Sequence, residues 1–327
     1  MNSEKLYRLL EQEAPPSTLL SELVLLISKE SNSKKVKNAA KKKHVQLLGK
    51  DSEYFAKQNG QFYTKRSIAE ICISNLDFSG VDLLVEPSAG RGDFLELFPS
   101  NIPSEALDID PKHPDVVEKD FLEFTPTKTG KIMVVGNPPF GLSANLAVSF
   151  FKHSSTFADT IAFILPRTFR KASIQNRLPL NFHLVKEVQL PENSFYVEGD
   201  SDIEDFELRG VFQVWEKKTA LRKKIQEDNS HPDFDFVNKK DSHDFSVRRA
   251  GARAGEITED TKDVVVQGNY FIKQNNKKVI DIFQKIWNNE LDPKVDKEKV
   301  GVKYDSAGQP SISKPEIVSL YKKWKNS

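Results

Sequence analysis

Between Gln61 and Lys217, short apolar runs alternate with stretches of helical periodicity, and this alternation constrains the fold more than any other feature. The runs with the length of buried strands are Asp82–Val85, Ala106–Ile109, Ile132–Val135, Ile161–Leu165, Leu184–Val188 and Val211–Trp215. Helical stretches lie between them, for example Ser67–Asn75 and Leu142–Lys152. Such alternation is typical of a mostly parallel sheet with helices on both faces. The sequence therefore predicts an α/β fold with a Rossmann-like sheet.

The charge of the chain is balanced, with 48 Lys and Arg against 47 Asp and Glu in 327 residues. A protein that coats nucleic acid through bulk positive charge is therefore not indicated. Any contact with a polyanion has to come from local clusters of cations.

Cysteine, histidine and apolar content exclude several other classes of protein. The single cysteine, Cys72, cannot form an intramolecular disulfide, which fits a reducing compartment. The histidines have no metal-ligand spacing, so no metal site is expected. No apolar run is long enough to span a membrane, and the N-terminus does not resemble a secretory signal. We expect a soluble protein of the cytoplasm or the nucleus.

Composition divides the chain into three predicted parts: residues 1–50, 51–217 and 218–327. The first part has two short amphipathic helices broken at Pro15-Pro16, and then a lysine-rich run from Ser31 to Lys50. That run is either a solvated helix or linker, or an arm that binds phosphates or directs nuclear import. The last part is polar, with apolar islands at 264–266 and 270–272 and predicted helices at 277–288 and 315–324.

The first predicted strand runs into a glycine-containing turn within Leu83–Leu95, and a helix is expected to follow it. Gly90 and Gly92 let the backbone approach a ligand closely, and a helix N-terminus adds amide donors. Purely structural turns also contain such pairs. Leu95 stands where a dinucleotide-binding loop has its third glycine, and Glu86 at the strand end would repel a pyrophosphate. An acid suits a positively charged cofactor, such as a sulfonium that carries an amino group.

The next predicted strand ends in carboxylates, within Ala106–Pro111. In a Rossmann-like sheet, an acid at the end of the second strand accepts hydrogen bonds from ribose hydroxyls. Asp108 is the predicted residue, ahead of Asp110. The alternative is that both acids only cap a loop.

Asn137-Pro138-Pro139-Phe140 follows directly after a third buried strand. Two consecutive prolines fix φ and remove two backbone donors, which makes a rigid turn with outward carbonyls. The Asn137 amide oxygen and the Pro138 carbonyl can accept two hydrogen bonds from an amino group, and Phe140 offers a flat face to its ring. These bonds draw the nitrogen toward tetrahedral geometry, so that its lone pair can attack a sulfonium methyl without a strong base. The alternative is a purely structural turn.

With these segments in this order, the chain resembles the S-adenosylmethionine (SAM)-dependent amino-methyltransferases of the adenine-N6 type. In that family Asn-Pro-Pro-Tyr/Phe follows a Glu-Pro-x-x-Gly-x-Gly loop. The resemblance covers about Gln61 to Lys217 and implies a Rossmann-like methyltransferase sheet, SAM as cofactor, and methyl transfer to adenine N6 in nucleic acid. The implied catalytic residues are Asn137, Pro138, Pro139 and Phe140, and the implied cofactor-binding residues are Tyr63, Thr64, Glu86, Ser88, Gly90, Gly92, Asp108, Asp120 and Phe121.

Three further segments extend this resemblance. Gln61–Thr64 resembles the segment that packs on the methionine moiety of the cofactor, with Lys65 where the family usually has proline. Lys119–Leu122 resembles the segment in which an aspartate contacts the cofactor's adenine and a phenylalanine packs against it. Leu190–Phe195 resembles a late motif, and Phe195 is therefore expected to help hold the flipped base.

The identity of the substrate stays open between several candidates. DNA is favoured somewhat over RNA, including capped mRNA ends, as the substrate. Adenine N6 is favoured over cytosine N4 as the methylated amino group, and nucleic acid is favoured over a protein glutamine amide. A catalytically silent subunit that binds nucleic acid beside an active partner is a further alternative. Arg248, Arg249 and Arg253, in a run interleaved with small residues, are predicted to contact the substrate. The alternative for this run is a flexible basic loop.

Overall fold

The computed structural model describes residues 62–141, 144–191, 193–196, 209–295, 301–306 and 309–326. Predictions for residues 1–50 and for Gln61 lie outside the described residues. The chain divides into two compact units, Met1–Tyr63 with Phe195–Asp205, and Thr64–Ser194 with Phe206–Ser327. Apart from Tyr63 and the short strand β8, the elements below belong to the second unit.

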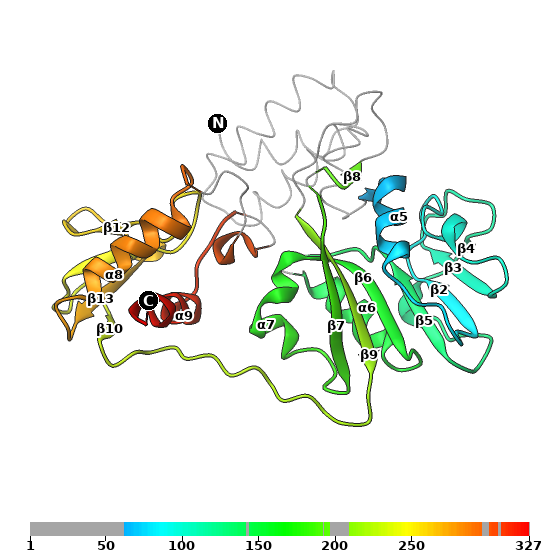
Figure 1. The fold of residues 1–327 in the computed structure, drawn as a ribbon. Helices are drawn as coiled ribbons and strands as arrows, with labels where there is room; N and C mark the ends of the chain where they lie inside the picture. The colour runs from blue at the N-terminus through cyan, green and yellow to red at the C-terminus, as the bar shows by residue number, and fades with distance from the viewer. Residues whose placement is uncertain are drawn as a thin grey trace, which may run out of the picture. The chain divides into compact units, whose positions relative to one another are not determined.

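A seven-stranded sheet, in the order β4-β3-β2-β5-β6-β9-β7, is the centre of residues 64–217 (Figure 1). Its strands are β2 (Leu83–Glu86), β3 (Ser104–Asp108), β4 (Val117–Glu118), β5 (Ile132–Gly136), β6 (Thr160–Pro166), β7 (Phe182–Gln189) and β9 (Gly210–Lys217). The pairs from β4 to β6 are parallel, and β9 is antiparallel to both of its neighbours. The prediction of a mostly parallel α/β sheet is confirmed, and only the two-residue strand β4 was not expected in it.

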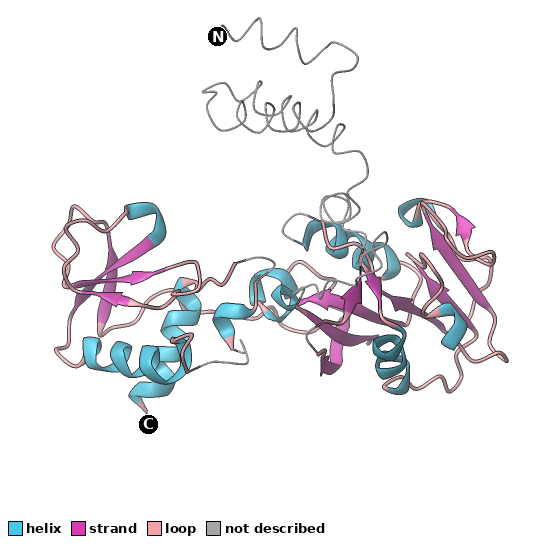
Figure 2. Ribbon diagram, turned by 90° about the horizontal axis from the view of Figure 1, so that it is seen from above, coloured by secondary structure: helices cyan, strands magenta, loops and turns pink. Residues whose placement is uncertain are grey.

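Helices lie on both sides of this strand layer (Figure 2). They are α5 (Arg66–Ser74), α6 (Asn145–Ser154), the short α7 (Ala172–Gln175), and the 3-10 helices η1 (Leu95–Leu97), η2 (Phe121–Glu123) and η4 (Arg167–Arg170). Alternate residues of the central strands, such as Val85, Val134 and Phe163, share a buried cluster with Phe151 of α6. Because the strands are apolar on both faces, they read as continuous apolar runs in the sequence.

The helix expected after the glycine turn is absent from the described residues, and this prediction was wrong. The chain makes turns from Gly90 to Phe94 and then only the 3-10 helix η1. Pro99 and Pro103 follow closely. Because proline disfavours helix in the residue before it and cannot continue the backbone bonding, little room is left for a longer helix before β3.

A second sheet forms in residues 234–274, in the order β10-β13-β11-β12, and all its pairs are antiparallel. Its elements and those that follow are β10 (Phe234–Val237), β11 (Phe245–Arg248), β12 (Ile257–Thr258), η5 (Val266–Gly268), β13 (Asn269–Gln274), α8 (Val279–Ile286), η6 (Trp287–Leu291), η7 (Val302–Tyr304) and α9 (Lys314–Lys325). Both predicted helices are present. A separate core joins them to the sheet, with Phe234 centred 5.3 Å from Phe283 and 5.0 Å from Tyr321.

The start of α9 is set by local sequence. Ser313 accepts a hydrogen bond from the Glu316 amide, and the Glu316 carboxylate accepts one from the Ser313 amide at 2.7 Å. This capping box, with Pro315 in the first turn, satisfies amide groups that have no partner inside the helix.

Candidate functional site

The order of strands in the large sheet reverses between β2 and β5, and ligands of such sheets bind outside the carboxyl ends of the strands at that point. The glycine turn follows β2, and Asn137–Phe140 follows β5. The topology therefore brings the two most specific sequence motifs to one place, although about fifty residues of chain separate them.

The glycine turn is held against β3 by backbone hydrogen bonds. The Ala89 amide donates to the Leu107 carbonyl at 2.8 Å. Gly90 and Gly92 have positive φ, 50° and 83°, which non-glycine residues rarely adopt. A Cβ at Gly92 would also lie 3.0 Å from Cδ2 of His113. Both glycines are thus required by the backbone of the turn.

Asp108, at the end of β3, supports this turn with both carboxylate oxygens. Its Oδ2 accepts a hydrogen bond from the Gly90 amide at 2.7 Å, and its Oδ1 accepts one from the Asp110 amide at 2.8 Å. A carboxylate oxygen has two lone pairs, so each still has capacity for a hydroxyl donor. Asp110 is exposed and pairs with Lys112 at 2.7 Å. Of the two acids, Asp108 is thus the one bonded to the glycine turn, and its role as the ribose acceptor stays a prediction.

Glu86 ends β2 as a buried carboxyl group, with 2% of the residue exposed. Burial raises its pKa well above the usual glutamate value; the nearby Asp93 and Asp108 raise it further, and a hydrogen bond from the Leu95 amide opposes them. Its Oε2 has no hydrogen-bond partner. A buried, unpartnered carboxyl oxygen beside two further acids is a site that a cation would stabilise.

The turn after β5 is linked directly to the glycine turn. The Ser88 hydroxyl donates to the Asn137 backbone carbonyl at 2.9 Å. Gly136 allows close approach, because a Cβ there would lie 3.3 Å from Cδ of Pro87. Pro138 is buried, whereas Asn137 and Phe140 are partly exposed. The two turns therefore form one connected structure.

Asp120 and Phe121 follow β4 at the neighbouring strand end. The Asp120 carboxylate accepts a hydrogen bond from the Leu122 amide at 2.8 Å. The Phe121 ring is 1% exposed and lies in an aromatic cluster, with centroids 5.0 Å from Phe150 and 5.0 Å from His153. Because the ring faces the core, the backbone of Phe121 is the part that remains for a contact with a cofactor.

Tyr63, Thr64 and Phe195 lie on two short strands that pair with each other, β1 (Tyr63–Thr64) and β8 (Phe195–Tyr196). The Tyr63 and Tyr196 rings stack with centroids 5.5 Å apart. Thr64 and Phe195 are buried. Their expected roles with the methionine moiety and the flipped base stay predictions.

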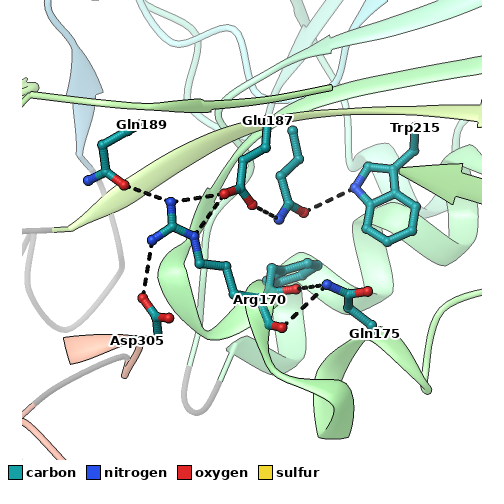
Figure 3. A network of polar contacts seen from close by, with 8 residues as sticks. Arg170, Gln175, Glu187, Gln189, Trp215 and Asp305 are labelled. Atoms are coloured by element: carbon teal, nitrogen blue, oxygen red, sulfur yellow. Dashed lines mark hydrogen bonds and ion pairs between the residues drawn. The ribbon is translucent and has the colours of Figure 1, made fainter. Parts of the chain in front are cut away.

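The structure also shows a polar network that the sequence did not predict, centred on Arg170 of η4 (Figure 3). Its guanidinium donates to Glu187 of β7 at 2.9 Å and to Gln189 at 2.6 Å, and it pairs with Asp305 at 3.3 Å. Burial raises the pKa of Asp305, and Arg170 opposes that effect. The sequence signal that could have indicated this network is the group of cations directly after a buried strand, in Pro166–Lys171.

The three arginines predicted to contact substrate have different surroundings. Arg248, at the end of β11, pairs with Glu256 at 3.9 Å, and Arg253 also pairs with Glu256. The Arg249 guanidinium instead lies over the ring of Tyr270, 5.3 Å from its centroid. The segment is held by backbone bonds such as that from the Gly255 amide to the Arg248 carbonyl at 2.7 Å, so it is an ordered turn.

The described ranges contain neither a metal-binding cluster nor a membrane-spanning helix. No group of three or more His, Cys, Asp or Glu side chains has an arrangement that could hold a metal ion. Within the same ranges, every helix is too short or too polar to span a bilayer.

No protein-family model and no curated protein matches the chain. Among solved structures, the 23S rRNA methyltransferase ErmE is 14% identical over 49% of this chain and 71% of its own, with a TM-score of 0.33. Magnesium protoporphyrin IX methyltransferase from Synechocystis, solved with bound SAM, is 10% identical over 46% of this chain and 77% of its own, with a TM-score of 0.33. Geranyl diphosphate methyltransferase in complex with SAM is 11% identical over 59% and 95%, with a TM-score of 0.35.

The fold assignment rests on the sheet itself. Parallel strands extend in both directions from the reversal between β2 and β5, and antiparallel β9 lies between β6 and β7. The sequence motifs follow the strands at whose ends a Rossmann-like sheet binds its ligand. The chain has a Rossmann-like α/β fold.

Proposed function

We propose that this protein transfers a methyl group from SAM to the exocyclic N6 amino group of adenine in nucleic acid. The observation that carries the proposal is the hydrogen bond from Ser88 to the Asn137 carbonyl at 2.9 Å. It joins a turn suited to a cationic cofactor to a turn suited to an amino group. The two reactants of a methyl transfer need such proximity.

The residues around the glycine turn fit SAM. The cofactor carries a sulfonium and an amino group, and Glu86 offers a buried carboxyl oxygen without a partner. Asp108 has acceptor capacity left for ribose hydroxyls after it has bound the Gly90 amide. A negatively charged pyrophosphate, by contrast, would meet Glu86, Asp93 and Asp108.

In the proposed reaction the cofactor supplies an electrophilic methyl group on sulfur. Asn137 Oδ1 and the Pro138 carbonyl accept hydrogen bonds from the two N–H groups of the substrate amine, which localises the nitrogen lone pair for attack. The new N–C bond forms as the S–C bond breaks, and the nitrogen then loses one proton to solvent. Phe140, partly exposed beside this turn, provides a stacking face for the base.

DNA is the first substrate to test, and RNA, including capped ends, is the second. The full chain is incubated with labelled SAM and with duplex DNA, single-stranded DNA or RNA, and the modified nucleoside is identified. A product other than N6-methyladenine would contradict the proposed target. The absence of transfer to every substrate would favour a silent subunit.

The central variant is Asn137→Ala. Because its amide oxygen acts mainly in the transition state, the rate should fall by about 100-fold or more while SAM affinity stays near wild type. Phe140→Leu should instead raise KM for the nucleic acid. Asn289→Ala is the matched control, since the Asn289 side chain is exposed and donates a hydrogen bond to the Lys285 carbonyl in the preceding helix α8. Full activity of a folded Asn137→Ala protein would show that the segment is only a structural turn.

A further inference from the structure

Two aromatic rings and two cations gather at one end of the second sheet. The rings of Phe236 on β10 and Tyr270 on β13 are 5.5 Å apart at an interplanar angle of 69°. Both rings pack against the core below them but stay partly exposed. Lys314 Nζ lies 4.8 Å from the Phe236 centroid and 5.8 Å from that of Tyr270, and Arg249 lies over Tyr270 at 5.3 Å. These four residues form what we call the cation–ring cluster.

The cluster is fixed by its backbone while its cations reach solvent. The Arg249 amide donates to the Gly268 carbonyl at 2.9 Å, and the Ile312 amide donates to the Arg249 carbonyl at 2.8 Å. Arg249 itself is exposed. Lys314 is the first residue of α9, which the capping box anchors. The positions of the two charges are therefore set by ordered segments.

These two cations differ from the neighbouring basic residues. Arg248 and Arg253 both pair with Glu256. Within the described residues, neither Arg249 nor Lys314 forms an ion pair with a carboxylate. Their charge is thus available to an anionic ligand.

Two exposed apolar side chains lie close in sequence to the cluster. Val265 and Val266 are 67% and 58% exposed, and they precede Gly268, whose carbonyl binds the Arg249 amide. Exposed aliphatic side chains gain nothing from phosphate, whereas apolar side chains can insert between neighbouring bases. The surface therefore offers positive charge, π-faces and apolar contact together.

We propose that the cation–ring cluster binds a single-stranded stretch of nucleic acid next to the target base. This rests on the proposed function and names the surface that holds its substrate. A base stacks on the exposed guanidinium of Arg249, which is itself backed by Tyr270, and Lys314 contacts phosphate. Aromatic platforms interleaved with cations are the usual means of binding single strands without sequence readout. An acidic peptide would need the charges but not the rings.

The cluster is connected to the sheet that carries the proposed catalytic turn. Glu316, two residues after Lys314, forms an ion pair with Lys171 at 3.0 Å. Lys171 follows η4 at the carboxyl end of β6, and β6 is the parallel neighbour of β5. A nucleic-acid strand held at the cluster would therefore be linked to the carboxyl ends of the parallel strands, where Asn137 lies.

The test measures binding of a fluorescent single-stranded oligonucleotide to the full chain by anisotropy, at several salt concentrations. The double variant Arg249→Gln with Lys314→Gln should weaken binding roughly tenfold and reduce the log–log salt slope by about 0.7, the value for the one phosphate contact that Lys314 makes. Lys277→Gln with Lys278→Gln, at two exposed positions after β13, is the matched control and should stay within twofold of wild type. Tyr270→Leu should weaken binding roughly tenfold without changing the salt slope.

The outcomes separate this inference from the proposed function. Equal loss of oligonucleotide affinity in both double variants overturns the inference. Unchanged oligonucleotide affinity in the cluster variant also overturns it, and this is the result that a docking site for an acidic protein would give. Loss confined to the cluster variants supports it, even if no methyl transfer is detected and the proposed function fails. Methylation with an unchanged KM in the cluster variants leaves the function standing and overturns the cluster. Thermal melting of each variant shows whether it is folded.

Discussion

We expect the binding of SAM to depend on pH through the carboxyl group of Glu86. Its pKa is raised because the carboxyl is buried and faces Asp93 and Asp108, with only the Leu95 amide opposing the shift. Below that raised pKa the group is protonated and neutral in the free protein. A bound cation favours the carboxylate, so binding of SAM should release one proton.

The release of one proton determines how strongly the affinity for SAM depends on pH. The association constant of SAM should rise tenfold per pH unit, about 1.4 kcal/mol, from near the ordinary glutamate value of about 4.3 up to the raised pKa of Glu86. Above the raised pKa the dependence should disappear. Stability of the free protein runs the other way: a raised carboxyl pKa gives stability below the ordinary value that is lost as pH rises through the raised one. SAM should therefore stabilise the protein most at high pH.

Isothermal calorimetry in buffers of different ionisation enthalpy measures the released proton directly. The pH should stay below about 7, where the α-amino group of the cofactor remains charged. Glu86→Gln should abolish the proton release and flatten the pH dependence of both affinity and stability. Glu118→Gln, at an exposed position on β4, is the matched control and should behave as wild type. Equal pH slopes in wild type and Glu86→Gln would refute the reasoning.

Three further substitutions test the glycine turn and its contacts. Gly92→Ala should destabilise the protein by about 1–2 kcal/mol in denaturant unfolding, because φ is 83° and the new Cβ meets His113. A second change, His113→Ala, should recover only the contact part of that loss, and full recovery would exclude backbone strain. Asp108→Asn should weaken SAM binding by about 1–3 kcal/mol in calorimetry, since the acceptor for the Gly90 amide and for ribose is impaired. Unchanged affinity would remove Asp108 from the cofactor site.

The large sheet was predictable because its strands are buried on both faces and so appear as continuous apolar runs. The second sheet was missed apart from the islands near β13. Strands β10 and β11 are four residues each, and β11 buries the polar Ser246, which weakens the apolar pattern. Their pairing with β13 joins distant segments, such as Phe234 with Gln274, and no local signal encodes that contact.

In the candidate site too, single residues could be predicted from the local sequence, whereas contacts between distant segments could not. Glu86, Asp108 and Asn137 could be proposed from the sequence because each lies at the end of a strand, or directly after one, that the sequence reveals. The bond between Ser88 and Asn137 depends on which strands are neighbours, and the contact between Arg170 and Asp305 depends on tertiary packing. Neither relation has a spacing that could be recognised along the chain.

The two outer strands of the large sheet determine whether a strand of another molecule can pair with it. Among the described strands, β4 at one edge has only two residues, both exposed. At the other edge, the register of β7 shifts between Leu184 and Lys186, and the strand carries charged side chains there. Short, irregular and charged edges resist pairing with a strand from another molecule. The sheet is therefore protected against edge-to-edge aggregation, and a partner protein would have to bind through side chains rather than by extending the sheet.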